Sequence, residues 1–398
     1  MKFNIWEDCP KVPITELLSS IVDNRGKTVP TADAGWKLIA TNCVTNNTLF
    51  PVYEKVRYLT QETYATWFRA HPIPGDILFV NKGTPGRVCM VPDPVDFCIA
   101  QDMIALRADN KKIYNRYLFA VLRSREIQQQ IYNTNVGDVI PHFKKQFMNQ
   151  LLIPVPDRKL QETIGNLYYQ LSYITELNSR INKNLFEQMQ ALYKDWFVNF
   201  EPFGGVRPSN WNYTNIYAIA NIIYGAPFAS KLFNTDGLGK PIIRIRDLKE
   251  QTFVTFTTEE HPKGHLIQPG DIVVGMDGEF RPYIWGNESA WLNQRVCIFE
   301  SNRPKGKAFV LYTIKPLLNK IEQTQVATTV IHIGKKDFDA FEIVLPDEAT
   351  LDSFDSITAP MVEKIVNNSL QNKRLAVLRD TLLPKLMSGE LDVSNIEL

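Results

Sequence analysis

Basic and amide side chains, rather than catalytic groups, are the residues of this sequence whose types and spacing suggest chemistry. In the second half of the chain they are Lys231, Lys240, Arg244, Arg246 and Lys249, and the two arginines alternate with isoleucines. A period of two places alternate side chains on one face of a strand, so we expect both guanidinium groups to point the same way. Arginine can contact phosphate or the two major-groove acceptors of guanine, while asparagine and glutamine suit adenine. An ordinary solvated strand face is the alternative interpretation.

Candidate DNA contacts in the first half of the chain are thinner and more scattered. Each of them could equally be a solvated surface residue. The residues predicted there are Lys27, Asn42, Lys55, Arg57, Lys82 and Arg87, with Asn46 and Asn47 nearby, and Arg281 completes the set in the second half.

Catalytic signatures are missing from the sequence. It contains no nucleotide-binding G-x-x-x-x-G-K-[ST] or G-x-G-x-x-G loop, no G-x-S-x-G, no H-E-x-x-H and no adenine-methylating tetrapeptide. His261 and His265 have a spacing that could bind a metal, but the Pro and Gly near them favour a loop. Asp277 and Glu279 are interpreted as a solvated turn, and Asp76 and the equivalent Asp271 as turn-opening residues. We therefore predict no catalytic residue and no metal site.

Length and composition indicate an ordinary globular protein of several domains. The chain has 398 residues, of which 44% are apolar and 22% charged, and its formal net charge is +1. Its five cysteines form no C-x-x-C pair and are expected to be buried free thiols. No apolar run approaches the about 18 residues of a membrane span, and acidic residues near the start argue against a signal peptide, so we expect a cytoplasmic protein.

The sequence repeats itself. Four blocks recur in the same order with small insertions, which predicts a tandem duplication. Lys and Arg exceed Asp and Glu in residues 1–150 and 205–345, whereas the remaining segments are net acidic, as expected if only the former approach a polyanion. The paired blocks are residues 178–185 with 368–375, 139–157 with 330–347, 74–77 with 269–272, and 35–39 with 239–243; Gln101 pairs with Gln294.

Two stretches, residues 158–200 and about 349–387, have helical periodicity. Apolar residues in both step by threes and fours, which is the seam of a coiled coil, and each helix is the obvious partner of the other. Pro360 is expected to kink or restart the second helix. The alternative is that each helix packs only on its own domain. The predicted seams are Ile164, Leu167, Leu171, Ile174, Asn178, Ile181, Leu185, Gln188 and Leu192, and Phe354, Ile357, Met361, Lys364 (or Ile365), Asn368, Gln371, Leu375, Leu378 and Leu382.

The fold class predicted from these patterns is α+β. A strand-rich globular domain followed by a long helix occurs twice, and the two helices pair as an antiparallel coiled coil. Residues 77–80 and 272–274 are predicted strands that follow Pro-Gly-Asp turns, and residues 123–131 and 311–321 are predicted helices. The predicted domains are residues 1–155 and 205–346, with helical spacers at 156–204 and 347–398.

These motifs together resemble the DNA specificity subunit of type I restriction-modification enzymes. The closing segment, residues 378–393, is the most specific part of the resemblance, and residues 153–157 and 343–347 are similar to the entries to the family's two conserved helices. Residues 75–87, 225–233, 239–248 and 270–278 are similar to its target-recognition domains. The first domain departs from the pattern, because Ala40 and Asn42 replace the Arg-x-Arg pair.

The resemblance implies a non-catalytic subunit whose two domains each read half of a split double-stranded DNA target. At about 1.5 Å per residue each helix would be roughly 55–60 Å long and would hold the domains apart. The implied partners are two modification subunits, which use S-adenosylmethionine on adenine, and restriction subunits, which use ATP and Mg²⁺; no cofactor is expected in this chain. A coiled-coil scaffold with two protein-binding domains is the alternative. Residues predicted on the partner-interface helices are Leu171, Ile174, Asn178, Ile181, Leu185, Leu192, Asn368, Leu375, Leu378 and Leu382.

Overall fold

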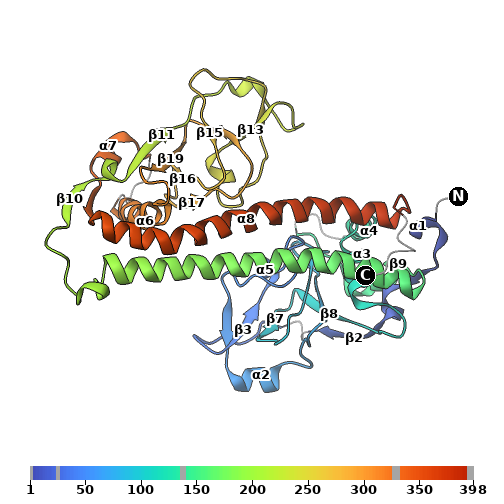
Figure 1. The fold of residues 1–398 in the computed structure, drawn as a ribbon. Helices are drawn as coiled ribbons and strands as arrows, with labels where there is room; N and C mark the ends of the chain where they lie inside the picture. Colours follow the sequence, from blue (N-terminus) through green and yellow to red (C-terminus); the bar gives the residue numbers. More distant parts are fainter. Residues whose placement is uncertain (1–2, 24–26, 135–139, 325–331, 392–398) are drawn as a thin grey trace. The chain divides into compact units, whose positions relative to one another are not determined.

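The structure is a computed structural model that describes residues 3–23, 27–134, 140–324 and 332–391. The chain divides into two compact units, residues 1–177 with 374–398 (unit 1) and residues 178–373 (unit 2). Each unit contains one strand-rich domain and part of each of the two long helices, α5 (Arg158–Phe197) and α8 (Glu348–Met387). This division arises because the helices are antiparallel, so the start of one packs beside the end of the other (Figure 1).

Domain 1, in unit 1, has a two-stranded sheet, β1-β9, and two larger sheets. One is antiparallel in the order β2-β8-β5-β6, and the other has the order β4-β3-β7 with β3 and β7 parallel. The strands are β1 (Lys11–Pro13), β2 (Leu18–Asp23), β3 (Trp36–Ile39), β4 (Arg57–Leu59), β5 (Ile77–Val80), β6 (Val88–Met90), β7 (Phe97–Ile99), β8 (Met103–Ala108) and β9 (Leu152–Pro154). The helices are α1 (Ile5–Asp8), α2 (Gln61–Trp67), α3 (Asn115–Leu122) and α4 (Arg125–Asn133), with 3-10 turns η1 (Ile14–Leu17), η2 (Thr41–Cys43) and η3 (Lys145–Gln150).

Domain 2, in unit 2, repeats this plan. It has a two-stranded sheet, β10-β20, an antiparallel sheet in the order β11-β19-β16-β17, and a third sheet in the order β12-β14-β13-β18-β15 with β13 and β18 parallel. The strands are β10 (Asn212–Asn215), β11 (Ala220–Tyr224), β12 (Phe233–Asn234), β13 (Lys240–Ile243), β14 (Phe256–Thr257), β15 (Leu266–Ile267), β16 (Ile272–Gly275), β17 (Pro282–Ile284), β18 (Ala290–Leu292), β19 (Val296–Ser301) and β20 (Glu342–Leu345). The helices are α6 (Lys307–Thr324) and α7 (Lys335–Asp339), with 3-10 turns η4 (Glu201–Phe203), η5 (Ile216–Ala218), η6 (Ser230–Leu232) and η7 (Ile245–Asp247).

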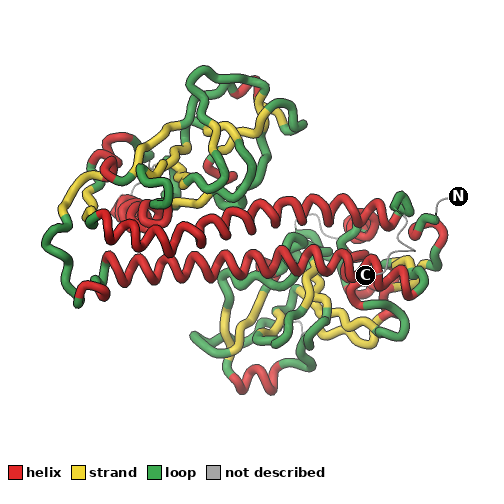
Figure 2. The backbone as a smooth tube through the Cα atoms, in the orientation of Figure 1, coloured by secondary structure: helices red, strands yellow, loops and turns green. Residues whose placement is uncertain are grey.

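The matching strand orders confirm the α+β tandem duplication. Both predicted strands, β5 and β16, are fully buried along their length, as expected for apolar runs at the centre of a sheet. The predicted helices at residues 123–131 and 311–321 appear as α4 and α6. Figure 2 shows the strands confined to the two domains and the long helices free of breaks. The helix α8 continues through Pro360, so the expected restart there is wrong.

The helices α5 and α8 pair as predicted, but the buried line on each helix differs from the predicted seam. Ile174 and Ile181 of α5 and Leu378 of α8 are exposed. At several positions the side chain that turns inward is the one directly after the predicted seam residue, as for buried Tyr168, Met189 and Arg379. The seam on α5 therefore follows 164, 168, 171, 175, 178, 182, 185 and 189, which has the same three-four spacing as the predicted line.

A cluster of amides crosses between the helices in unit 2. Asn178 and Asn368 are buried, as expected for polar seam residues that fix alignment. Four of its hydrogen bonds form two pairs in which the two repeats exchange roles, so this part of the cluster has local two-fold symmetry. Asn178 donates to Asn372 (2.9 Å), Asn368 to Asn182 (2.8 Å), Asn182 to the Ser369 hydroxyl (3.1 Å) and Asn372 to the Ser179 hydroxyl (3.2 Å).

The repeated Pro-Asp pair explains where the two long helices begin. Asp157 accepts a hydrogen bond from the Leu160 N–H (3.0 Å), and Asp347 accepts one from the Thr350 N–H (3.0 Å), so each caps a first turn. Asp347 also accepts from the Trp211 indole N–H (2.9 Å). The Thr350 backbone N–H and then the Trp211 indole lower the pKa of Asp347 below its ordinary value.

Asp347→Ala is expected to lower the free energy of unfolding by about 1–2 kcal/mol, because the cap and the indole both lose an acceptor. Since the pKa of Asp347 is lowered in the folded state, its contribution is full above the unfolded pKa of about 4 and is lost as the pH falls through the folded pKa. Denaturant unfolding of the wild type and the variant at neutral and acidic pH measures both effects. Asp347→Asn, which keeps a capping oxygen, should retain most of the stability at neutral pH. A difference between wild type and Asp347→Ala that grows on acidification would contradict the assignment.

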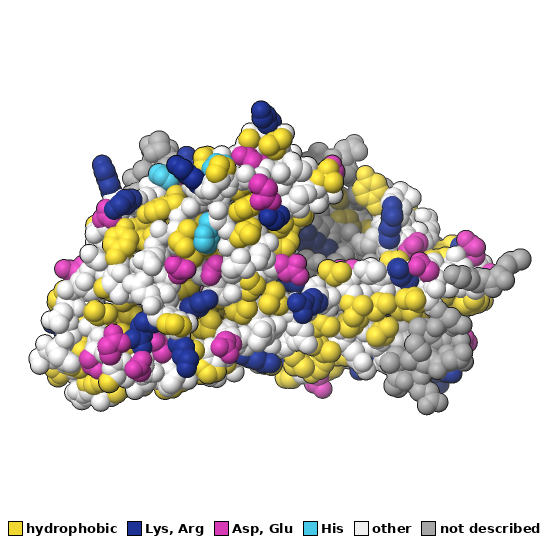
Figure 3. All heavy atoms as spheres, turned by 45° about the horizontal axis from the view of Figure 1, so that its top comes forward, with side chains coloured by type: hydrophobic (Ala, Val, Ile, Leu, Met, Phe, Trp, Pro, Cys, Tyr) yellow, Lys and Arg dark blue, Asp and Glu magenta, His cyan; other side chains and the backbone are white. Residues whose placement is uncertain are grey.

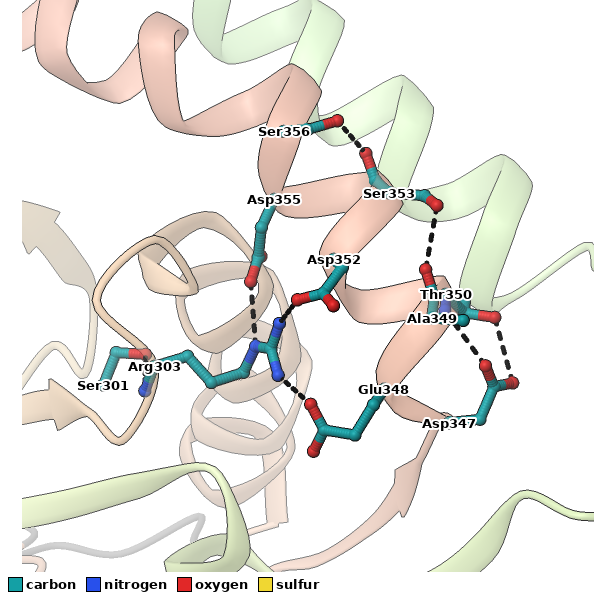
Figure 4. Close-up of polar contacts among 10 residues, drawn as sticks. All are labelled: Ser301, Arg303, Asp347, Glu348, Ala349, Thr350, Asp352, Ser353, Asp355 and Ser356. Carbon is teal, nitrogen blue, oxygen red and sulfur yellow. Dashed lines mark hydrogen bonds and ion pairs between the residues drawn. The ribbon is translucent and has the colours of Figure 1, made fainter.

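Arg303 joins domain 2 to the first turns of α8. Its guanidinium contacts the carboxylates of Glu348, Asp352 and Asp355, and its Nε donates to Asp355 over 2.9 Å (Figure 4). Asp355 is only 2% exposed, and burial raises the pKa of its carboxyl. One cation therefore holds three successive acidic residues of the helix face.

Arg303→Met is expected to lower the free energy of unfolding by about 3 kcal/mol, because it leaves the buried Asp355 charge without its partner. Arg281→Met, which breaks an exposed pair with Glu279, is the matched control and should change stability by no more than about 0.5 kcal/mol. Calorimetry of the full chain compares the two. Equal stability losses in the two variants would show that the Arg303 contacts do not hold the domain.

Candidate nucleic-acid interface

The loops that follow strands β3, β5 and β7 meet at one end of domain 1. Three backbone hydrogen bonds define this end: Ala100 N–H to Ile39 O (2.9 Å), Asn81 N–H to Asp102 O (2.9 Å) and Phe143 N–H to Asn81 O (2.8 Å). Because the carboxyl ends of the parallel pair β3 and β7 face the same way, the side chains after both strands lie together. We call Ala40, Lys82, Gln101, Asp102 and His142 the loop end of domain 1.

Domain 2 has the same backbone frame. Asn293 N–H donates to Ile243 O (3.3 Å), Met276 N–H to Arg295 O (2.9 Å) and Ile333 N–H to Met276 O (2.9 Å). Isolated bridges link Lys82 to His142 in domain 1 and Asp277 to His332 in domain 2. The loop end of domain 2 is therefore Arg244, Asp277, Gln294, Arg295 and His332, in the same order as the residues of domain 1.

The loop end of domain 1 borders a hollow of 210 Å³. Ala40 contributes only a methyl group where domain 2 has Arg244. Polar groups of Thr28, Arg57, Gln101 and Asp102 line it, so it offers both donors and an acceptor. Arg57 projects from β4, beside β3, and so supplies a guanidinium to a domain that lacks the Arg-x-Arg pair.

The loop end of domain 2 carries a connected group of charged side chains instead. His332 Nδ1 donates to Asp277 Oδ1 over 2.6 Å, and Arg295 Nη1 lies 3.0 Å from the same ring nitrogen. Arg295 Nε lies 3.6 Å from Asp277 Oδ2. The side chains of Arg295 and His332 are each 48% exposed, so the group faces solvent.

The predicted strand face with Arg244 and Arg246 is wrong. Strand β13 ends at Ile243, and η7 follows, because the Asp247 carboxylate accepts a hydrogen bond from the Arg244 backbone N–H (3.0 Å) and closes a turn. Arg244 is half-buried at the loop end, whereas Arg246 turns to the Thr255 hydroxyl (3.2 Å). The register of the strand pairs places Thr255 where domain 1 has Arg57, so an arginine is associated with this strand position in both domains.

The other predicted DNA contacts are exposed but only partly gathered. Lys82 belongs to the loop end of domain 1, and Lys27 is next in sequence to Thr28, which lines the hollow. Lys240 pairs with Glu260 (2.8 Å) and Arg281 with Glu279 (3.4 Å), while Asn42 donates to the Glu54 carbonyl (2.6 Å). Lys55, Arg87, Lys231 and Lys249 are exposed on loops and turns outside the two loop ends.

Sequence reasoning missed Asp102, Arg295 and His332 as candidate contacts and took Asp277 for a solvated turn residue. The signal that could have found them was the pairing of Gln101 with Gln294. The residues that follow this pair are Asp102 and Arg295, so the alignment already places opposite charges at equivalent positions.

The remaining chemistry is sparse in the part of the chain that the structure describes. No group of three or more His, Cys, Asp or Glu side chains that could hold a metal ion occurs among those residues, and none of their helices is long and apolar enough to cross a membrane. All five cysteines are buried free thiols, as predicted, and burial raises the pKa of Cys98 to about 12. On the face drawn in Figure 3, Lys and Arg side chains are interspersed with acidic ones.

Comparison with known proteins identifies the class. A family model described as the type I restriction modification DNA specificity domain matches residues 27–187 and 208–378. The specificity subunit of the type I restriction enzyme MjaIX from Methanocaldococcus jannaschii is 23% identical over 343 residues, which cover 81% of this chain and 79% of that protein. The EcoBI specificity subunit from Escherichia coli is 35% identical over 138 residues, covering 34% of this chain and 29% of that protein.

The fold agrees with this assignment. A crystal structure of a type I restriction-modification system S subunit from M. genitalium aligns with a TM-score of 0.57 at 17% identity, covering 97% of this chain and 98% of that one. Two tandem domains with long helices, matched twice by the same family model, define a DNA specificity protein. The chain belongs to the family of DNA specificity subunits of type I restriction-modification enzymes.

Proposed function

We propose that this chain is the non-catalytic DNA-binding subunit of a type I restriction-modification complex, and that each domain reads one half of a split target. The observation that carries this proposal is the pair of loop ends. They share one backbone frame and differ in their side chains, as two readers of different half-sites should. Amide and charged groups at each end can pair with base edges in the major groove.

The long helices would set the spacing of the half-sites and dock the modification and restriction subunits. Support comes from apolar side chains that remain exposed on the paired helices of unit 1, at Tyr173, Ile174 and Leu177 of α5 and Val377 and Leu378 of α8. Exposed apolar groups that gather on a pair of helices are typical of a protein interface. S-adenosylmethionine, ATP and Mg²⁺ would act in the partner subunits, which would carry the catalysis.

Domain exchange tests the two-reader model. Residues 1–155 are replaced by the equivalent segment of a relative with a different specificity, and N6-methyladenine is mapped by single-molecule sequencing in cells that express the modification subunits. We expect a new sequence in one half of the split motif and an unchanged other half and spacer. Changes in both halves would contradict independent reading. An unchanged methylome in the presence of active partners would favour the protein-interaction scaffold.

A further inference from the structure

Equivalent positions in the two loop ends carry opposite charges. Lys82 and Asp102 of domain 1 correspond to Asp277 and Arg295 of domain 2. The equivalence rests on matching backbone hydrogen bonds. The Asp102 carbonyl accepts from the Asn81 N–H, directly before Lys82, over 2.9 Å. The Arg295 carbonyl accepts from the Met276 N–H, directly before Asp277, over 2.9 Å. The two pairs therefore occupy the same places on the same frame with their signs reversed.

A position that hosts a cation in one domain and an anion in the other is poorly suited to binding phosphate. The phosphates of a duplex are anionic along its whole length, so a carboxylate that faced them would be repelled. Base edges differ, because guanine presents two acceptors in the major groove and cytosine and adenine present an amino donor. Charge reversal at Asp102 and Arg295 thus matches the variation among bases.

The guanidinium of Arg295 forms an ion pair within its own loop end before any ligand arrives. Asp277 Oδ2 lies 3.6 Å from its Nε, and Asp277 Oδ1 accepts a hydrogen bond from His332, so the histidine fixes the carboxylate that faces Arg295. A guanidinium carries five N–H donors in a planar fork, so donors remain for a base. A side chain that an ion pair restrains and that is 48% exposed can recognise a base with less further loss of freedom than an unrestrained one.

We propose that Arg295 and Asp102 are specificity-determining residues. Arg295 reads a guanine through its two major-groove acceptors, and Asp102 accepts a hydrogen bond from the amino group of a cytosine or an adenine in the other half-site. Asp277 is a positioning residue for Arg295, and His332 acts on Arg295 through the Asp277 carboxylate. This inference rests on the proposed function and names the side chains that make the two half-sites differ.

The test uses the full chain assembled with its modification subunits and a library of duplexes randomised in both half-sites. Binding is measured for each sequence with the wild type, Arg295→Gln and Asp102→Ala. We expect Arg295→Gln to lose about 10- to 100-fold discrimination at one base pair of the half-site read by domain 2, with the other half-site unchanged. Asp102→Ala should do the same at one base pair of the opposite half-site. Asp277→Asn should relax the same base pair as Arg295→Gln, by a smaller factor.

Two further variants separate base reading from other roles. Arg295→Lys keeps the charge but loses the planar fork, so we expect it to relax the preference while non-specific affinity is retained. Lys305→Gln removes a charge beside Gly270, at the opposite end of β16, and should leave every preference unchanged. Thermal unfolding of each variant shows that it is folded.

Several outcomes would overturn the inference. An equal loss of affinity for all sequences would make Arg295 a phosphate contact, and an unchanged preference profile in a folded Arg295→Gln variant would remove it from the interface. A wild-type complex without any sequence preference would instead refute the proposed function. The failure of the two proposals can thus be told apart.

Discussion

Arg244→Ala is expected to weaken binding of the assembled complex to its DNA target by about 10- to 100-fold. Arg244 is the first residue after β13, and it is half-buried at the loop end of domain 2, where the Asn293 N–H binds the carbonyl of the preceding residue. Its backbone is fixed by the Asp247 carboxylate, so its side chain projects from a rigid turn. The loss of one preorganised guanidinium from a DNA interface costs about 1–3 kcal/mol, which corresponds to this range.

Salt titration of the same variant distinguishes the kind of contact that Arg244 makes. If it binds a phosphate, the slope of log affinity against log salt should become less steep by about 0.9, and all sequences should weaken alike. If it binds a base, the slope should stay unchanged, and the preference at one base pair of the target should weaken. Ala40→Arg is the reciprocal variant, because it places a guanidinium at the equivalent position of domain 1 and should alter only the other half-site. Arg244→Ala with wild-type affinity, slope and preference would remove this residue from the interface.

The duplication was the part of this molecule that the sequence revealed most fully. Repeated blocks predicted two domains of one fold and two pairing helices, because the same apolar and turn residues must build the same strands and caps twice. The Pro-Asp pairs and the Pro-Gly-Asp turns behave in this way. Asp157 and Asp347 cap helices, and Asp76 and Asp271 accept hydrogen bonds from the N–H of Ile73 and Gln268.

The sequence was less informative where two local patterns satisfy the same spacing. On α5 either the third or the fourth residue after Leu171 and Asn178 could face the partner helix. The more apolar Ile174 and Ile181 are exposed, and Thr175 and Asn182 face inward instead. Asn182 faces inward because its amide donates a hydrogen bond to Ser369 of α8. The pattern of a single helix cannot reveal such a contact. The strand predicted from the alternation of Arg244 and Arg246 was wrong for a related reason. The Asp247 side chain accepts a hydrogen bond from the Arg244 backbone N–H, and the strand ends there.

Gly165→Ala is expected to destabilise unit 1 by about 2–3 kcal/mol, although the same change in an exposed helix stabilises by about 1 kcal/mol. Gly165 lies in α5 where that helix touches the start of α3, and a Cβ atom there would lie 2.5 Å from the Tyr117 backbone nitrogen. Backbone cannot move aside as a side chain can, so α3 and the core residues around it would shift.

Calorimetry of the full chain should show the unfolding temperature of unit 1 lowered by about 4–9 °C. Hydrogen-exchange measurements should show faster exchange in α3. Gln170→Ala, an exposed position five residues further along α5, is the matched control and should change stability by no more than about 0.5 kcal/mol. Because α3 leads from β8 of the same sheet as β5, a displaced α3 should also weaken reading of the half-site assigned to domain 1 and leave the other intact. A stabilised Gly165→Ala variant would mean that α5 and α3 do not approach this closely, and that the glycine serves another purpose.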